Sequence, residues 1–90
     1  MPNQTEYPIN GELDLHTFNP KELKDLIPEY IHACQDKGIY QIRIIHGKGK
    51  GILGRSVHSI LDNLKEVEAY WQEGSGGGWG ATIAKLKYRT

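Results

Sequence analysis

The chain has 90 residues, of which 38% are hydrophobic and 24% are charged, and its formal net charge is zero. This composition is typical of one small globular domain and excludes a disordered segment. Because no apolar run approaches the ~20 residues that span a bilayer and no secretory signal is present, we expect a cytoplasmic protein with no membrane partner. The single cysteine excludes an internal disulfide, and no paired Cys/His spacing indicates zinc.

The positive charges are unevenly distributed along this neutral chain. Between Lys37 and Leu61 the sequence has five basic residues and no acidic residue. A local positive field of this kind favours a phosphate-bearing partner, although such a cluster is also common on an ordinary solvated face. The charge alone leaves both interpretations open.

The chain begins with a polar segment and continues into a strand. Residues 1–10 contain two prolines and few apolar side chains, so we expect a flexible tail and assign the domain to residues 11–90. In residues 11–16, GELDLH, leucines alternate with polar residues as they do in a half-buried strand.

A helix start follows this strand. Asn19 suits the N-cap, Pro20 suits the first helical position, and Glu22 completes a capping-box pattern. Apolar residues then recur at helical spacing on both sides of Pro28. The sequence therefore predicts a kinked helix that ends at Gly38.

The second half of the chain predicts three more strands and one more helix. Residues 40–45, YQIRII, are rich in β-branched side chains and form a second expected strand. An apolar stripe over residues 53–64 indicates a second amphipathic helix. Residues 67–72 and 81–87 are the third and fourth expected strands, and the glycine-rich residues 73–80 connect them as a hairpin loop.

The element order β-α-β-α-β-β favours a two-layer α/β fold. Strands joined through a helix are expected to be parallel, and the fourth strand, which arrives through a short loop, is expected to be antiparallel. Each helix has one apolar stripe, and the first two strands each have a polar side. We therefore predict a four-stranded mixed sheet with both helices on one face and the other face at least partly open to solvent.

The glycine-rich residues 44–56, IIHGKGKGILGRS, fit two nucleotide-binding patterns imperfectly. Gly49–Gly54 matches a dinucleotide fingerprint between a strand and a helix, but the chain lacks the second half of a dinucleotide domain. Gly49–Ser56 resembles a phosphate-binding loop, but Arg55 stands where lysine is required. We therefore expect no nucleotide cofactor. A glycine-rich turn at a helix N-terminus still favours phosphate binding.

Two histidines and two glycine loops are expected to converge at one edge of the sheet. His16 and His46 each follow a strand of a parallel βαβ unit, so both belong to the edge where ligands usually bind in open α/β sheets. Asp14 lies on the face of His16 one pleat earlier. The loop 74–80 starts at the same edge if the third strand is parallel to the first two. Singly, each histidine is more often structural than functional; His32 and His58, within helices, are predicted to be surface or packing residues.

Three segments resemble the signature blocks of the Smr (small MutS-related) domain family. They are LDLH at residues 13–16, HGKG at residues 46–49 and GGWGATI at residues 77–83. Their order and spacing match over nearly the whole chain. The resemblance implies a two-layer βαβαββ fold like that of the C-terminal domain of bacterial translation initiation factor 3. It also implies nucleic-acid binding, because Smr domains bind DNA or RNA and several members are endonucleases.

The resemblance assigns roles to the residues of these blocks. Asp14 and His16 are implied to belong to a cleavage site, while the second and third blocks shape the nucleic-acid surface. Many members have glycine after LDLH, whereas Thr17 stands here, and this departure puts catalysis more in doubt than binding. Together with the basic residues of the loop, the predicted nucleic-acid-binding residues are His46, Gly47, Lys48, Gly49, Lys50, Gly51, Arg55, Gly77, Gly78, Trp79 and Gly80.

The leading hypothesis is a DNA-nicking or RNA-cleaving endonuclease. His16 is the expected general acid or base, and Asp14 orients it or holds a divalent ion, Mg²⁺ or Mn²⁺. Trp79 is placed to stack on an unpaired base. The alternatives are a nucleic-acid-binding module without catalysis and, more distantly, a nucleotide-dependent enzyme. A monomer is favoured, and the chain could be part of a larger protein.

Overall fold

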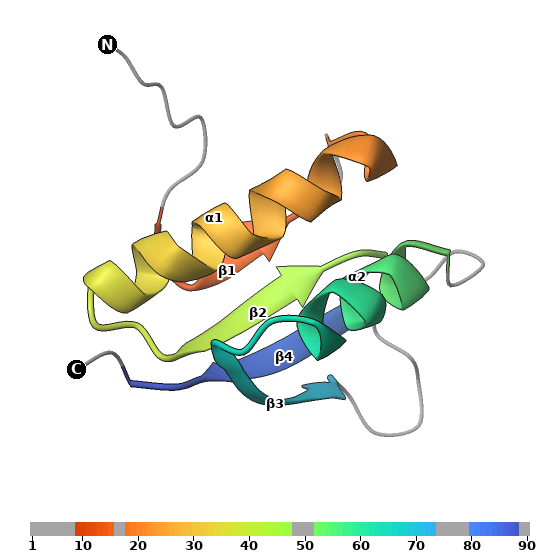
Figure 1. Ribbon diagram of the computed structural model, residues 1–90. Helices are drawn as coiled ribbons and strands as arrows, with labels where there is room; N and C mark the ends of the chain where they lie inside the picture. The colour runs from red at the N-terminus through yellow and green to blue at the C-terminus, as the bar shows by residue number, and fades with distance from the viewer. Residues whose placement is uncertain (1–8, 16–17, 48–51, 74–79, 89–90) are drawn as a thin grey trace, which may run out of the picture.

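A four-stranded mixed sheet with two helices on one face forms the part of the chain that the computed structural model describes, residues 9–15, 18–47, 52–73 and 80–88 (Figure 1). Its strands are β1 (Glu12–Asp14), β2 (Gln41–Ile45), β3 (Val67–Gln72) and β4 (Ala81–Leu86). Its helices are α1 (Leu23–Asp36), preceded by the 3₁₀ turn η1 (Pro20–Glu22), and α2 (Ile52–Asp62). The predicted two-layer α/β class and element order are confirmed.

The strands lie in the order β1-β2-β4-β3. β1 pairs with β2 in parallel, and β4 runs antiparallel to both β2 and β3. The three strands β1, β2 and β3 therefore share one direction and β4 opposes them, as the crossover rules predicted. β4 is inserted between β2 and β3, so its first residue lies at the edge where β1, β2 and β3 end.

The first helix begins through a reciprocal cap. The side-chain oxygen of Asn19 accepts the Lys21 N–H at 3.0 Å, and the Glu22 carboxylate accepts the Asn19 N–H at 2.8 Å. The expected capping box is present, but its first turn is 3₁₀ and the α-helix starts only after it. α1 then continues through Pro28, and Gly38 follows its end with φ of +80°.

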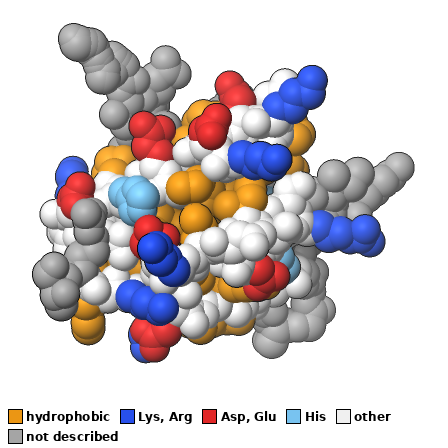
Figure 2. Space-filling view, viewed as in Figure 1, with side chains coloured by type: hydrophobic (Ala, Val, Ile, Leu, Met, Phe, Trp, Pro, Cys, Tyr) orange, Lys and Arg blue, Asp and Glu red, His pale blue; other side chains and the backbone are white. Residues whose placement is uncertain are grey.

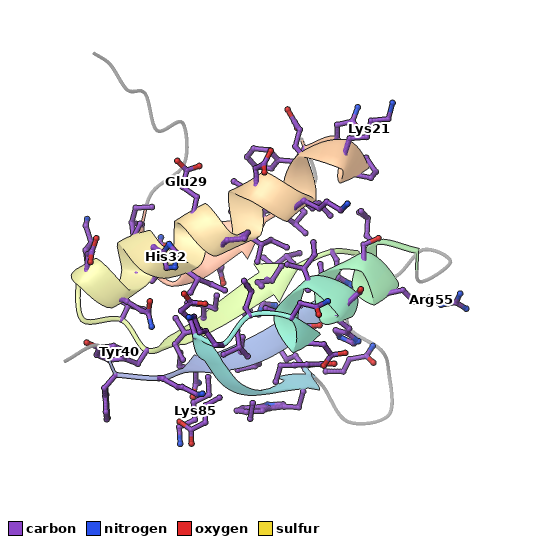
Figure 3. The ribbon with its side chains drawn as sticks, in the orientation of Figure 1. Lys21, Glu29, His32, Tyr40, Arg55 and Lys85 are labelled. Atoms are coloured by element: carbon purple, nitrogen blue, oxygen red, sulfur yellow. The ribbon has the colours of Figure 1, made fainter. Side chains whose placement is uncertain are left out.

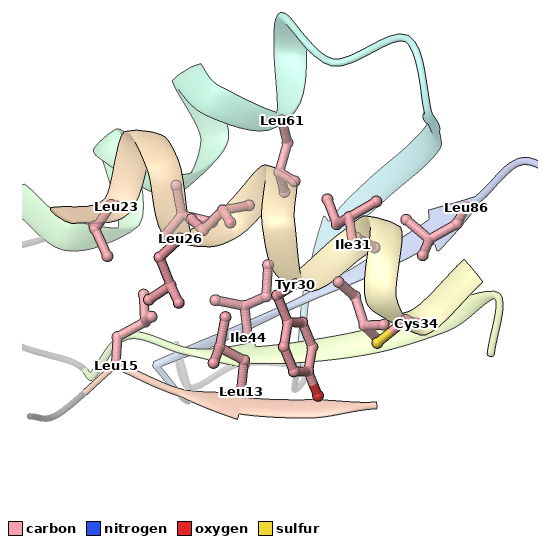
Figure 4. Close-up of a cluster of buried hydrophobic side chains, with 14 residues drawn as sticks. Leu13, Leu15, Leu23, Leu26, Tyr30, Ile31, Cys34, Ile44, Leu61 and Leu86 are labelled. Carbon is pink, nitrogen blue, oxygen red and sulfur yellow. The ribbon is translucent and has the colours of Figure 1, made fainter. Parts of the chain in front are cut away.

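The core lies between the two helices and one face of the sheet (Figure 4). Leu13, Ile42 and Ile44 point from the strands toward the helices and are at most 1% exposed. Tyr30 of α1 and Leu61 of α2 reach the same layer from the helix side. The apolar stripe predicted for the first helix is buried along its whole length; its members are Leu23, Leu26, Ile27, Tyr30, Ile31 and Cys34.

The opposite face of the sheet is only partly covered, as expected from its polar side chains. Arg43 donates from Nε to the Glu73 carboxylate and from a terminal nitrogen to the Glu12 carboxylate, both at 2.8 Å. Trp71 of β3 is 46% exposed. No helix in the described part of the chain is long and apolar enough to cross a membrane. The predicted tail lies outside the described residues as far as residue 8, and Ile9 packs against the core.

Candidate functional site

One edge of the sheet gathers the ends of β1 and β2 and the start of β4. The pairing sets Asp14 beside Ile45 and Ile45 beside Ala81, so three neighbouring strands meet the edge in register. The residues that follow β2 and precede β4 are His46 and Gly80. The described members of the three motif blocks therefore come together, although they are far apart in the sequence (Figure 1).

A single carbonyl group joins the second block to the third. The Gly80 carbonyl oxygen accepts hydrogen bonds from the backbone N–H of His46 at 2.7 Å and from that of Gly47 at 2.8 Å. The Gly47 amide is thus bound to the first residues of the β4 segment at the sheet edge. Gly47 has φ of +83° and Gly80 has φ of +76°, a backbone region that glycine adopts without the strain a side chain would add.

His46 points into the structure and is held through both ring nitrogens. Its Nε2 lies 2.9 Å from the Thr82 hydroxyl oxygen, and its Nδ1 lies 3.2 Å from the Gly47 carbonyl oxygen. Burial lowers the pKa of His46 below its ordinary value, and the nearby His58 adds to this effect, while the Gly47 carbonyl opposes it. His46 is therefore best suited to positioning the loop that it starts, and less suited to accepting a proton from a substrate.

Sequence reasoning missed two further members of this cluster, Thr82 and His58. His58 of α2 brings its Nε2 to 2.8 Å from the Thr82 hydroxyl, which is fully buried. The His58 ring also stacks against Tyr70 with 4.9 Å between ring centroids, and the Tyr70 hydroxyl donates to the Asp62 carboxylate at 2.8 Å. Thr82 could have indicated this cluster from the sequence. It lies on the apolar face of an expected strand, and a buried hydroxyl group there needs a hydrogen-bond partner.

Hydrogen positions in this cluster follow from the chemistry of its groups. The Gly47 carbonyl can only accept, so Nδ1 of His46 carries a proton. In the neutral ring Nε2 is then an acceptor and takes the one proton of the Thr82 hydroxyl. The Thr82 oxygen accepts in turn from Nε2–H of His58. One buried hydroxyl on β4 therefore links the two imidazole rings.

The last glycine of the dinucleotide-like pattern, Gly54, has a packing role. It lies inside α2 and is buried, and a Cβ at this position would stand 3.2 Å from Cε1 of His46. The absence of a side chain lets the helix approach the His46 ring. Arg55, the next residue, is exposed on the first turn of α2. Its predicted role in nucleic-acid binding stays a prediction.

Several predicted site residues lie outside the described part of the chain. They are His16, Lys48, Gly49, Lys50, Gly51, Gly77, Gly78 and Trp79. Asp14 is described, and it is exposed at the end of β1. The functional roles assigned to all of these residues, Asp14 included, stay predictions.

The geometry defines a class of protein, a two-layer α/β domain in which Gly47 and Gly80 meet at the edge where β1 and β2 end. The family model described as "Smr domain" matches residues 13–87 of this chain. The chain belongs to the Smr domain family.

Similar proteins extend this assignment. The chain is 36% identical over 80 residues to "Endonuclease MutS2" of Brevibacillus brevis and 38% identical over 80 residues to the protein of that name from Symbiobacterium thermophilum. In each case 88% of this chain is aligned, and it spans about a tenth (10%) of the length of the MutS2 relative. The homologous region is thus one domain within a larger protein.

Two solved structures share the fold. The Smr domain of Thermus thermophilus MutS2 superposes with a TM-score of 0.77 at 26% identity, covering 87% of this chain and 99% of that one. YdaL, a stand-alone small MutS-related protein from Escherichia coli, superposes with a TM-score of 0.74 at 28% identity, covering 91% of this chain and 68% of that one. The fold thus occurs both within MutS2 and in a stand-alone protein.

Proposed function

We propose that this chain is a nucleic-acid-binding domain that cleaves phosphodiester bonds in DNA or RNA. The observation that carries the proposal is the junction of the three motif blocks at one sheet edge, where Asp14, His46 and Gly80 lie on adjacent strands or directly beyond their ends. The names of the MutS2 relatives, which include the word endonuclease, support the same function.

Binding in this proposal depends on the loop that leaves the edge at Gly47. The Gly47 amide is engaged by Gly80, so its role is to set the direction of the loop. The main-chain N–H groups of Gly49 and Gly51 are then the proposed donors to phosphate oxygens. Lys48, Lys50 and Arg55 add positive charge, which fixes position on the backbone without reading sequence.

Cleavage in this proposal depends on the first block. A water molecule attacks phosphorus, the bond to one ester oxygen breaks, and a proton passes to that leaving oxygen. His16 serves as the general acid or base for these proton transfers because an imidazole titrates near neutral pH. Asp14 orients the His16 ring or binds a divalent cation. His46 is a poor alternative for this role, because both of its ring nitrogens already have partners in the protein.

The test is a cleavage panel with purified protein. Nicking of supercoiled DNA and cutting of single-stranded RNA are measured with Mg²⁺, with Mn²⁺ and with a chelator. His16→Ala is expected to abolish cleavage while binding is retained, and Asp14→Asn is expected to reduce it strongly. Cleavage by His16→Ala at the wild-type rate would overturn the assignment of His16. If the protein binds nucleic acid in a salt-dependent way but cleaves it under none of these conditions, the result supports a binding module without catalysis. Thr17 favours that alternative.

A further inference from the structure

A basic groove lies between the first turns of the η1–α1 segment and one side of α2, along which it extends as far as Ile60. It has a volume of about 480 Å³ and is lined by Lys21 and Lys24 on one side and by Arg55, Ser56 and Ser59 of α2 on the other. Pro20 and Ile60 also line it, and among the described residues no acidic side chain does. Three cationic side chains and two hydroxyl groups are the donor set that suits phosphate oxygens.

The fold sets this groove beside the candidate site. η1 follows the end of β1 and α2 follows the end of β2, so both helices begin at the edge where the motif blocks meet. Lys21 and Arg55 consequently project at the same end of the molecule, far from Tyr40 (Figure 3). The N-terminal ends of both helices add partial positive charge at this end.

The acidic side chains near Lys21 and Lys24, in η1 and the first turn of α1, do not line the groove. The Glu22 carboxylate accepts the Asn19 N–H at 2.8 Å as part of the helix cap. Asp25 is exposed and is not among the lining residues. Figure 2 shows Lys and Arg side chains at the upper right and right of the molecule, over the starts of the two helices, with acidic side chains toward the upper edge.

A second groove at the opposite edge of the sheet provides an internal comparison. It also has two lysines, Lys65 and Lys87, but Glu66 lies among them and forms an ion pair with His32 at 2.8 Å. Its mixed charge suits a polyanion poorly. The positive lining is thus a property of the groove beside the motif blocks.

We propose that the groove between η1 and α2 holds the phosphodiester backbone of the same nucleic-acid strand that reaches the loops. Lys21 and Lys24 extend the phosphate contacts of Arg55 onto the first helix, so the strand passes from the sheet edge across the helix layer. This inference rests on the proposed function, and it adds two binding residues that belong to none of the three motif blocks.

The test compares two double variants with equal change in charge. Lys21→Gln with Lys24→Gln removes both lysines of the groove, while Lys65→Gln with Lys87→Gln removes both lysines of the opposite edge. Binding of a fluorescent oligonucleotide is measured against salt concentration, and circular dichroism checks that each variant is folded. The first variant is expected to flatten the slope of log K against log salt by about one unit for each lysine, and the second is expected to keep the wild-type slope.

The possible outcomes separate the two proposals. If the slope of log K against log salt is the same in the wild type and in both variants, Lys21 and Lys24 do not contact phosphate and the proposed groove is wrong. Binding at the loops is compatible with that result. Equal flattening in both variants would show general attraction by net charge and would also overturn the groove. Wild-type protein that binds neither DNA nor RNA at any salt concentration would overturn the proposed function, and the groove with it.

Discussion

The hydroxyl group of Thr82 holds the ring of His46 from inside the sheet, with 2.9 Å between Oγ1 and Nε2. The same hydroxyl lies 2.8 Å from Nε2 of His58, so a buried side chain on β4 connects the strand end that starts the glycine loop with helix α2. The position of the His46 ring therefore depends on how α2 packs over the sheet.

Replacement of Thr82 by valine is expected to destabilise the fold. Valine keeps the shape but removes the hydroxyl, which leaves Nε2 of His46 and Nε2 of His58 without this partner. The expected loss is about 1–3 kcal/mol in the free energy of unfolding, measured by urea denaturation, because partly buried polar groups then lack hydrogen bonds. Thr82→Ser is the control, since it retains the hydroxyl. Equal stability of the two variants would contradict this role of the hydroxyl.

Stability is expected to fall as the solution becomes acidic, through His46. Its pKa is lowered from 6.5 by burial, so the unfolded chain binds the proton more readily than the folded one. The stabilisation is fully present above about pH 6.5 and is lost as the pH falls through the lower pKa of the folded state. Among the described residues, His58 of α2 is the titratable group that faces His46.

This pH dependence can be isolated from that of the carboxylates. Glu66, whose pKa is lowered from 4.5 chiefly by its hydrogen bond with His32, loses its contribution only in more acidic solution. A comparison of unfolding free energies at about pH 7.5 and about pH 5 therefore leaves out most of the carboxylate contribution. His46→Gln is expected to reduce the difference between these two values. An undiminished difference in His46→Gln would assign the effect to another group.

Gly54→Ala tests the contact between α2 and the His46 ring. A glycine-to-alanine change inside a helix ordinarily stabilises by about 0.5–1 kcal/mol. Here the new Cβ would stand 3.2 Å from Cε1 and 3.4 Å from Nδ1 of a ring that two hydrogen bonds hold in place. We expect a net loss of about 1 kcal/mol in unfolding free energy, since overpacking costs more than the helix gains.

A double-mutant cycle identifies the source of that loss. His46→Ala removes the ring, so Gly54→Ala in that background is expected to recover the ordinary helix gain. Urea denaturation of the four proteins gives the coupling between the two positions. Additive effects would show that the His46 ring is not the obstacle.

The local pattern of the sequence predicted the elements and the edge at which the described residues of the three blocks meet. Alternation in β1 and β2 and the apolar stripes of the helices fixed which faces are buried. The parallel βαβ rule was then enough to bring Asp14 and His46 to one edge. The insertion of β4 between β2 and β3 was not predicted, because strand order depends on pairing between distant segments. The contact of His58 with Thr82 was missed for a related reason, since it depends on the rotation of α2 over the sheet.

Gly47 provides the last test, because it is the last described residue before the glycine-rich segment 48–51 and has a positive φ. Its φ of +83° is costly for residues with a side chain, yet a Cβ there would meet no atom within 4 Å. Gly47→Ala is therefore expected to cost about 1 kcal/mol through backbone strain alone, whereas Gly47→Asn is expected to cost less because asparagine tolerates this region. Unfolding free energies and oligonucleotide affinities are measured for both variants. Oligonucleotide affinity is expected to follow the same order, with the wild type tightest, Gly47→Asn weaker and Gly47→Ala weakest. If Gly47→Ala binds as tightly as the wild type, binding does not depend on the backbone conformation of Gly47.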